Sequence, residues 1–222
     1  MTTAVKICGL QSADQIRQIK NLSIDYVGFV FAPSKRQVTP TQTAEAIQEL
    51  SVEGIRCFQA AGVFVNPSLV ELREVLAEAA LDVVQLHGAE QPAFCAEVKE
   101  QFGVKVFKAF SLNEQLWTNE QVKSVLAPYQ GTIDAALLDT YDPVYGGGSG
   151  KTFRWEVIPV WKKAARELGI PLFVAGGLHE GNIADLIDKY EPDGVDVSSG
   201  VETDGVKDIK KIRIFVERVK NR

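Results

Sequence analysis

The stretch Val5-Lys6-Ile7-Cys8-Gly9-Leu10 sets the pattern for the whole chain, because in it a short apolar strand gives way to a loop. A stretch with helical spacing, residues 13–20, follows at once. In a parallel barrel built from such units, the loops after the strands share one rim, and chemistry is carried out there. The thiol of Cys8, the last residue of the strand, is therefore predicted to lie at the rim of a functional site.

The same strand–loop–helix unit recurs along the chain, at about 28 residues per unit. Strands are predicted at residues 5–8, 26–31, 61–65, 83–86, 104–109, 135–138, 171–175 and 194–197. Helices are predicted at residues 13–20, 43–50, 68–80, 92–102, 119–127, 155–168, 182–190 and 208–219. Strict alternation predicts an α/β fold with a parallel sheet, and eight units close into a single (β/α)8 TIM barrel that occupies residues 1–222 as one domain. An open doubly wound sheet is the alternative, and it typically has fewer strands.

Composition narrows the classes of protein. With 222 residues and 45% apolar content, the chain can bury a substantial core. It has neither an apolar run of membrane-spanning length nor a signal-peptide pattern, so we expect no membrane association. The three cysteines (Cys8, Cys57 and Cys95) are odd in number and widely spaced, which indicates a reducing cytoplasm rather than a disulfide framework or structural zinc. A net charge of −5 argues against a nucleic-acid partner but allows a small anionic ligand.

Strand alternation predicts which side chains point into the barrel. Outward-facing positions meet the apolar faces of helices, so polar residues at alternate positions should face inward. The predicted inward set includes Lys6, Cys8, Gln85, His87, Leu137, Asp139, Asp196 and Ser198. A buried lysine and a buried aspartate are costly unless paired, and the first and last strands are neighbours in a closed barrel. We therefore predict a Lys6–Asp196 ion pair beneath Cys8; that it only neutralises two buried charges is an equal alternative.

Two glycine-containing loops follow the last two predicted strands. Gly176-Gly177 ends the seventh strand, and Ser198-Ser199-Gly200 follows the eighth. Barrels that act on phosphorylated substrates often hold the phosphate between these two loops, on backbone N–H groups that glycine leaves accessible. Glycine also serves ordinary turns. The two loops together predict a phosphate site.

Residues 146–152, Gly-Gly-Gly-Ser-Gly-Lys-Thr, look like a nucleotide-binding P-loop but do not match its spacing. The first glycine that the motif requires falls on Tyr145, and the segment follows a sixth strand instead of a first. We expect a lid beside Asp139, which ends that strand, or alternatively an ordinary surface loop.

The strand ends form an ordered series of short motifs: Lys6-Ile7-Cys8-Gly9-Leu10, Gly28-Phe29-Val30-Phe31, Ser34-Lys35-Arg36, Gly62-Val63-Phe64-Val65-Asn66, Val84-Gln85-Leu86-His87-Gly88, Leu137-Leu138-Asp139-Thr140, Ala175-Gly176-Gly177-Leu178 and Gly194-Val195-Asp196-Val197-Ser198-Ser199-Gly200-Val201-Glu202. In this series the whole chain resembles the phosphoribosylanthranilate isomerase family of tryptophan biosynthesis. It departs from the family at residues 146–148, where three glycines stand in place of two.

The resemblance implies an Amadori rearrangement of N-(5-phosphoribosyl)anthranilate to 1-(2-carboxyphenylamino)-1-deoxyribulose 5-phosphate. Asp139 matches the family's acid, which protonates the furanose ring oxygen. Cys8 matches its base, which takes the proton from ribose C2, and we expect Lys6 to help stabilise the thiolate. Arg36 matches the residue that holds the anthranilate carboxylate. No covalent intermediate on Cys8 is expected, and His87 is given no catalytic role.

The resemblance implies a small phosphorylated substrate and no cofactor or metal ion, in a protein that is a monomer or a homodimer. Three rival functions fit the sequence less well. A metal-dependent sugar-phosphate epimerase would need two inward histidines, whereas only His87 is predicted to face inward. Indole-glycerol-phosphate synthase would place lysine and glutamate at the strand ends that carry Cys8 and Asp139. A non-catalytic barrel would have little reason to combine both groups with the phosphate loops.

Overall fold

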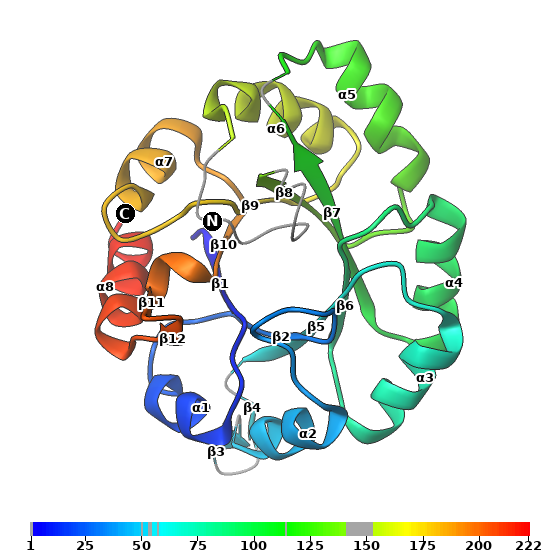
Figure 1. Ribbon diagram of the computed structural model, residues 1–222. Coiled ribbons are helices and arrows are strands. Elements are labelled where there is room, and N and C mark those ends of the chain that lie inside the picture. Colours follow the sequence, from blue (N-terminus) through cyan, green and yellow to red (C-terminus); the bar gives the residue numbers. More distant parts are fainter. Residues whose placement is uncertain (1, 50, 53–54, 57, 114, 141–152) are drawn as a thin grey trace.

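Eight parallel strands close into a barrel in the computed structural model, which describes residues 2–49, 51–52, 55–56, 58–113, 115–140 and 153–222. The barrel strands are β1 (Ala4–Cys8), β2 (Tyr26–Val30), β5 (Gln59–Phe64), β6 (Val83–Leu86), β7 (Lys105–Leu112), β8 (Ala135–Thr140), β9 (Leu172–Val174) and β10 (Gly194–Val197). Each pairs with its neighbour in chain order, and β1 pairs with β10 to close the ring (Figure 1). The predicted (β/α)8 barrel is confirmed.

A ring of helices surrounds the barrel (Figure 1). The α-helices are α1 (Ala13–Ile19), α2 (Pro40–Gln48), α3 (Leu69–Glu78), α4 (Pro92–Phe102), α5 (Asn119–Leu126), α6 (Ile158–Glu167), α7 (Ile183–Tyr190) and α8 (Ile209–Lys220). Short 3-10 turns are η1 (Ala127–Tyr129), η2 (Trp155–Val157) and η3 (Ser199–Val201). Within the described ranges, no helix has both the length and the apolar character needed to cross a bilayer.

Local capping accounts for the early start of one predicted helix. Helix α2 begins at Pro40, three residues before the predicted start. Thr39 and Gln42 form a reciprocal capping box, and proline at the first helical position needs no hydrogen-bond partner for its nitrogen. Two short hairpins were not predicted: β3 (Ser51–Val52) with β4 (Ile55–Arg56), and β11 (Glu202–Thr203) with β12 (Val206–Lys207).

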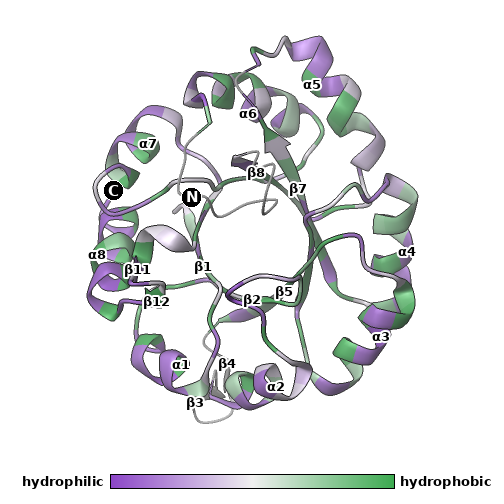
Figure 2. Ribbon diagram, viewed as in Figure 1, coloured by the Kyte–Doolittle hydropathy of each residue, from purple (hydrophilic) through white to green (hydrophobic). Residues whose placement is uncertain are grey.

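The core has two layers, as alternation along the strands requires. Outward residues such as Val5, Ile7 and Leu138 pack against the surrounding helices. Figure 2 shows that these helices carry both hydrophobic and hydrophilic residues. The inner layer is a separate cluster made of Ala61, Val83, Phe107, Ala109, Ala135, Leu137, Phe173 and Ala175. The rings of Tyr26, Phe107 and Phe173 meet there with centroids 5.2–5.8 Å apart. Side chains therefore fill the barrel interior below the carboxyl ends of the strands. Chemistry is therefore confined to the rim above.

Candidate active site

A cleft of about 830 Å³, measured out to its open mouth, lies at the carboxyl ends of the strands. It is lined by the predicted site residues Cys8, Arg36, Asp139, Gly176, Gly177, Ser198 and Ser199, together with Gln85, His87 and Asp196. Strand order explains this gathering, because β10 and β9 stand between β1, which carries Cys8, and β8, which carries Asp139. The predicted phosphate loops therefore lie on the short arc between the thiol and the carboxylate.

The predicted ion pair lies directly beneath the cleft. Lys6 and Asp196 are register partners of β1 and β10, and Lys6 Nζ lies 3.0 Å from Asp196 Oδ2. The Lys6 side chain has no exposed surface. Burial alone would lower the pKa of Lys6, but the charge of Asp196 and the contact with Cys8 outweigh it and raise that pKa. Lys6 is therefore a permanent cation inside the barrel, and the prediction of the pair is confirmed.

Cys8 lies above this cation, in a space that depends on Gly28. A Cβ added at Gly28 would lie 2.8 Å from Cys8 Sγ and 3.0 Å from Lys6 Nζ. Burial raises the pKa of the Cys8 thiol above its usual value, and the Lys6 charge lowers it only in part. The Lys6 charge favours the thiolate, as expected, but burial has the larger effect on the Cys8 pKa. The protonated thiol is therefore the main form in the resting protein.

Asp139 is the penultimate residue of β8 and is held by the backbone around it. The backbone N–H of Thr140 donates to Asp139 Oδ1 at 2.7 Å. Gly176 leaves room for this carboxylate, since a Cβ there would lie 2.9 Å from Oδ1. His87 Nε2 approaches Oδ2 to 3.3 Å but without hydrogen-bond geometry. The histidine that sequence reasoning left without a role is thus the neighbour of the candidate acid.

Three buried polar atoms in the lining have no hydrogen-bond partner in the described ranges: Gln85 Oε1, His87 Nε2 and Asp196 Oδ1. Most buried polar side-chain atoms in proteins are partnered. These three atoms are available for hydrogen bonds with a molecule bound in the cleft. Among the described residues, no group of three or more His, Cys, Asp or Glu side chains could hold a metal ion.

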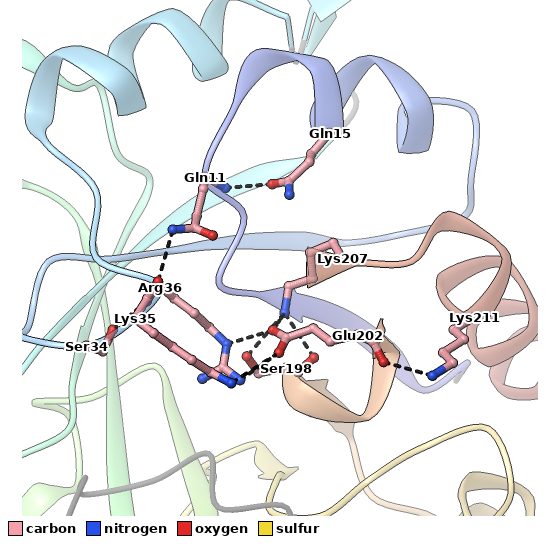
Figure 3. A network of polar contacts seen from close by, with 9 residues as sticks. All are labelled: Gln11, Gln15, Ser34, Lys35, Arg36, Ser198, Glu202, Lys207 and Lys211. Carbon is pink, nitrogen blue, oxygen red and sulfur yellow. Dashed lines mark hydrogen bonds and ion pairs between the residues drawn. The ribbon is translucent and has the colours of Figure 1, made fainter. Parts of the chain in front are cut away.

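Arg36 meets a carboxylate that sequence reasoning did not assign. It lies in the loop after β2, and its Nε and Nη2 donate to Glu202 Oε1 at 2.6 Å and to Oε2 at 2.9 Å. Lys207 Nζ donates to the same Oε1 at 2.6 Å and to the Ser198 carbonyl at 2.9 Å (Figure 3). Glu202 and Lys207 belong to the unpredicted β11–β12 hairpin. Its turn is Asp204-Gly205, a common hairpin signal that could have identified it.

The predicted phosphate residues lie close together, although not all face the cleft. Gly176 and Gly177 have φ values of 76° and 63°, a left-handed conformation that favours glycine. Gly200 is not among the lining residues. A Cβ there would lie 1.8 Å from the Leu178 carbonyl oxygen, so Gly200 instead lets the two loops approach each other. The expected lid, residues 146–152, and Cys57 fall outside the described residues.

Fold and cleft together define a (β/α)8-barrel enzyme with its active site at the carboxyl rim. The family described as N-(5'phosphoribosyl)anthranilate (PRA) isomerase matches residues 5–218. A Brevibacillus brevis N-(5'-phosphoribosyl)anthranilate isomerase is 48% identical over 218 residues, which cover 98% of this chain and 94% of the relative. The chain belongs to the phosphoribosylanthranilate isomerase family, an isomerase family of tryptophan biosynthesis.

Solved structures agree with this assignment. One describes monomers generated from the dimeric phosphoribosylanthranilate isomerase of Thermotoga maritima, with a TM-score of 0.79 and 32% identity over 99% of this chain and all of that one. Another shows a phosphoribosylanthranilate isomerase in complex with reduced 1-(o-carboxyphenylamino)-1-deoxyribulose 5-phosphate, with a TM-score of 0.77 and 31% identity at the same coverage.

The charges below Cys8 predict opposite effects on its reactivity. The thiolate is the form that reacts with iodoacetamide, so the alkylation rate of Cys8 should rise with pH. The midpoint of this rise should lie above the usual thiol pKa. Lys6→Met removes a charge that lowers the Cys8 pKa and should move the midpoint up. Asp196→Asn removes a charge that raises it and should move the midpoint down. Mass spectrometry of the Cys8 peptide measures both, and shifts in the same direction would contradict this electrostatic account.

Proposed function

We propose that Cys8 and Asp139 are the base and the acid of the isomerisation of N-(5'-phosphoribosyl)anthranilate in this protein. One observation carries the proposal: a thiol and a carboxylate at the carboxyl ends of β1 and β8 line the same cleft, with the glycine-containing loops of β9 and β10 between them. A sugar phosphate held by those loops would extend between the two groups. The chemistry they can perform is a proton delivered to one substrate atom and a proton removed from another.

The first step opens the ribose ring. The Asp139 carboxyl gives its proton to the furanose ring oxygen, the bond from that oxygen to C1 breaks, and the amine lone pair forms a Schiff base at C1. Asp139 is left as a carboxylate beside His87, whose Nε2 lies 3.3 Å from Oδ2. The second step removes the C2 proton. Its electron pair forms the C1–C2 double bond, and the nitrogen becomes neutral. The resulting enolamine then tautomerises to the ketone, moving a proton from the C2 hydroxyl to C1.

Cys8 is the group that takes the C2 proton, and Lys6 makes this feasible. In the productive form of the protein, the Asp139 carboxyl is protonated and the Cys8 thiol is deprotonated. Burial works against that form by raising the Cys8 pKa, and the Lys6 charge limits the penalty. Asp196 keeps Lys6 in place through the 3.0 Å ion pair. In this mechanism the Lys6–Asp196 pair therefore favours the Cys8 thiolate, in addition to neutralising two buried charges.

Recognition of the substrate's two anionic ends completes the proposal. We expect the phosphate to bind backbone N–H groups of Gly176, Gly177 and Ser199 and the Ser198 hydroxyl, with Gly200 shaping the loop. We expect the anthranilate carboxylate to bind Arg36, whose guanidinium geometry suits a carboxylate. The ligand named in the solved relative, reduced 1-(o-carboxyphenylamino)-1-deoxyribulose 5-phosphate, has both anionic groups.

Several further expectations remain predictions. They are a single domain over residues 1–222, a cytoplasmic location without membrane association, a monomer or homodimer, and no nucleic-acid partner, cofactor or metal ion. None of the chemical steps above depends on them.

Substituting either proton-transfer group should abolish most of the activity. Cys8→Ser replaces the thiol with a much weaker acid, and Asp139→Asn cannot give up a proton. Each should lower kcat by about 10²- to 10⁴-fold. Loss of the substrate's anthranilate-ester fluorescence, followed on freshly made substrate, measures the rate. Cys95→Ala, at a buried cysteine of α4, is the matched control and should remain active. Near-full activity in either site variant would refute the assigned role.

Arg36→Ala should affect binding more than turnover. If the guanidinium holds a carboxylate that does not react, its removal weakens ground state and transition state alike, so KM rises more than kcat falls. Steady-state kinetics separate the two constants. Arg73→Ala is the matched control, because Arg73 is an exposed arginine of α3 and does not line the cleft. A large fall in kcat at unchanged KM would show that Arg36 acts on the chemical step instead.

A further inference from the structure

We propose that Glu202 is a positioning residue, which holds the Arg36 guanidinium so that its remaining donors face the substrate carboxylate. This inference rests on the proposed role of Arg36. Sequence reasoning assigned no function to Glu202. The structure brings the two residues together although they lie 166 positions apart, from the loop after β2 and from the hairpin after β10.

The geometry allows Arg36 to bind two carboxylates at once. A guanidinium has five N–H donors: one on Nε and two on each terminal nitrogen. Glu202 occupies one edge, through Nε at 2.6 Å and Nη2 at 2.9 Å. No described residue is bonded to the end of the guanidinium, formed by Nη1 and the second hydrogen of Nη2, so this end can serve another planar acceptor. Arg36 itself lines the cleft, so that acceptor can be the carboxylate of a bound substrate.

Glu202 is a fixed anchor. Its side chain is 5% exposed, and Lys207 Nζ donates to Oε1 at 2.6 Å. Lys211 Nζ donates to the backbone carbonyl of Glu202 at 2.8 Å, as Figure 3 shows. Burial works to raise the pKa of Glu202, but hydrogen bonds from Arg36 and Lys207 outweigh it and hold the pKa below its usual range. The anchor is therefore an ionised carboxylate with a defined orientation.

A competing role, in which Glu202 leaves Arg36 when substrate arrives, fits the structure less well. Separating the pair would leave Lys207 on Oε1 but would take from Oε2 of this nearly buried carboxylate its guanidinium donor, which is unfavourable. The Arg36 side chain also has little room to swing, because it crosses Gly9. A Cβ there would lie 2.5 Å from Arg36 Cδ. Gly9 also adopts a φ of 82°, a left-handed conformation. A side chain at this position is therefore disfavoured both by the backbone and by the contact with Arg36.

The local charge still attracts an anion while Glu202 remains bound. Arg36 and Lys207 contact the carboxylate directly, and Lys35 Nζ lies 3.9 Å from Oε2. Three cations around one carboxylate leave this part of the rim positive. Lys207 also donates to the carbonyl and the hydroxyl of Ser198, at 2.9 and 3.3 Å. The same network therefore links the holder of the substrate carboxylate to the predicted phosphate loop.

The test compares two ligands on Glu202→Gln, which keeps the shape of the side chain and removes its charge. One ligand is reduced 1-(o-carboxyphenylamino)-1-deoxyribulose 5-phosphate, and the other is the same compound without the benzoate carboxylate. Both dissociation constants are measured by calorimetry. The constant of the second ligand divided by that of the first reports the preference for the carboxylate. We expect Glu202→Gln to reduce this ratio by about tenfold, the loss of one charge-assisted contact, and to change binding of the second ligand little.

Two further variants make the outcomes distinct. Asp204→Asn, in the exposed turn of the same hairpin, should keep the wild-type ratio. Arg36→Ala should lose the preference altogether; if it does not, the proposed role of Arg36 fails and this inference fails with it. Loss of the preference in Arg36→Ala but not in Glu202→Gln overturns the positioning role alone. Tighter binding of the carboxylate ligand to Glu202→Gln would identify Glu202 as a competitor, and equal weakening of both ligands would reduce it to a structural residue.

Discussion

The buried ion pair between Lys6 and Asp196 is the interaction on which the site depends. The two residues face each other across the seam where β1 and β10 close the barrel, 3.0 Å apart. Removing one partner from such a pair typically costs about 3–5 kcal/mol, because the other charge stays buried. Below the pair the barrel is filled by aromatic rings and small side chains. Two residues further along the chain, at the rim above the pair, Cys8 ends β1 and Ser198 directly follows β10. The pair thus separates a packed interior from a reactive surface.

Much of this arrangement follows from patterns visible in the sequence. Alternation of strands and helices predicts the barrel, and alternation within strands places Lys6, Cys8, Asp139 and Asp196 inside it. Closure of the ring then makes the first and last strands neighbours, which is why the ion pair could be predicted. The Arg36–Glu202 contact could not, because it joins two loops whose approach depends on the whole barrel. The net pKa shift of Cys8 was also out of reach, since it depends on the depth of burial against the nearness of Lys6.

The rim combines two kinds of electrostatic environment. Cys8 and Asp139, the proposed proton-transfer groups, have a cation below the thiol and a histidine beside the carboxylate. Arg36, Lys207 and Lys35 form a positive region around Glu202, which in our proposal binds and orients the substrate. The two regions meet at the Cys8-Gly9 turn, where the Arg36 side chain passes over the backbone next to the thiol. A substrate with a carboxylate at one end and a phosphate at the other would be held along this rim, with its ribose carbons over Cys8.

The central claim, that Cys8 removes the ribose C2 proton, is tested most directly by single-turnover kinetics with substrate deuterated at C2. The measurement belongs near pH 6, where the raised pKa of Cys8 leaves little thiolate and proton removal should limit the rate. The account predicts that the deuterated substrate rearranges clearly more slowly than the protiated one. Equal rates for the two, together with a substrate-sized mass gain on Cys8, would contradict it.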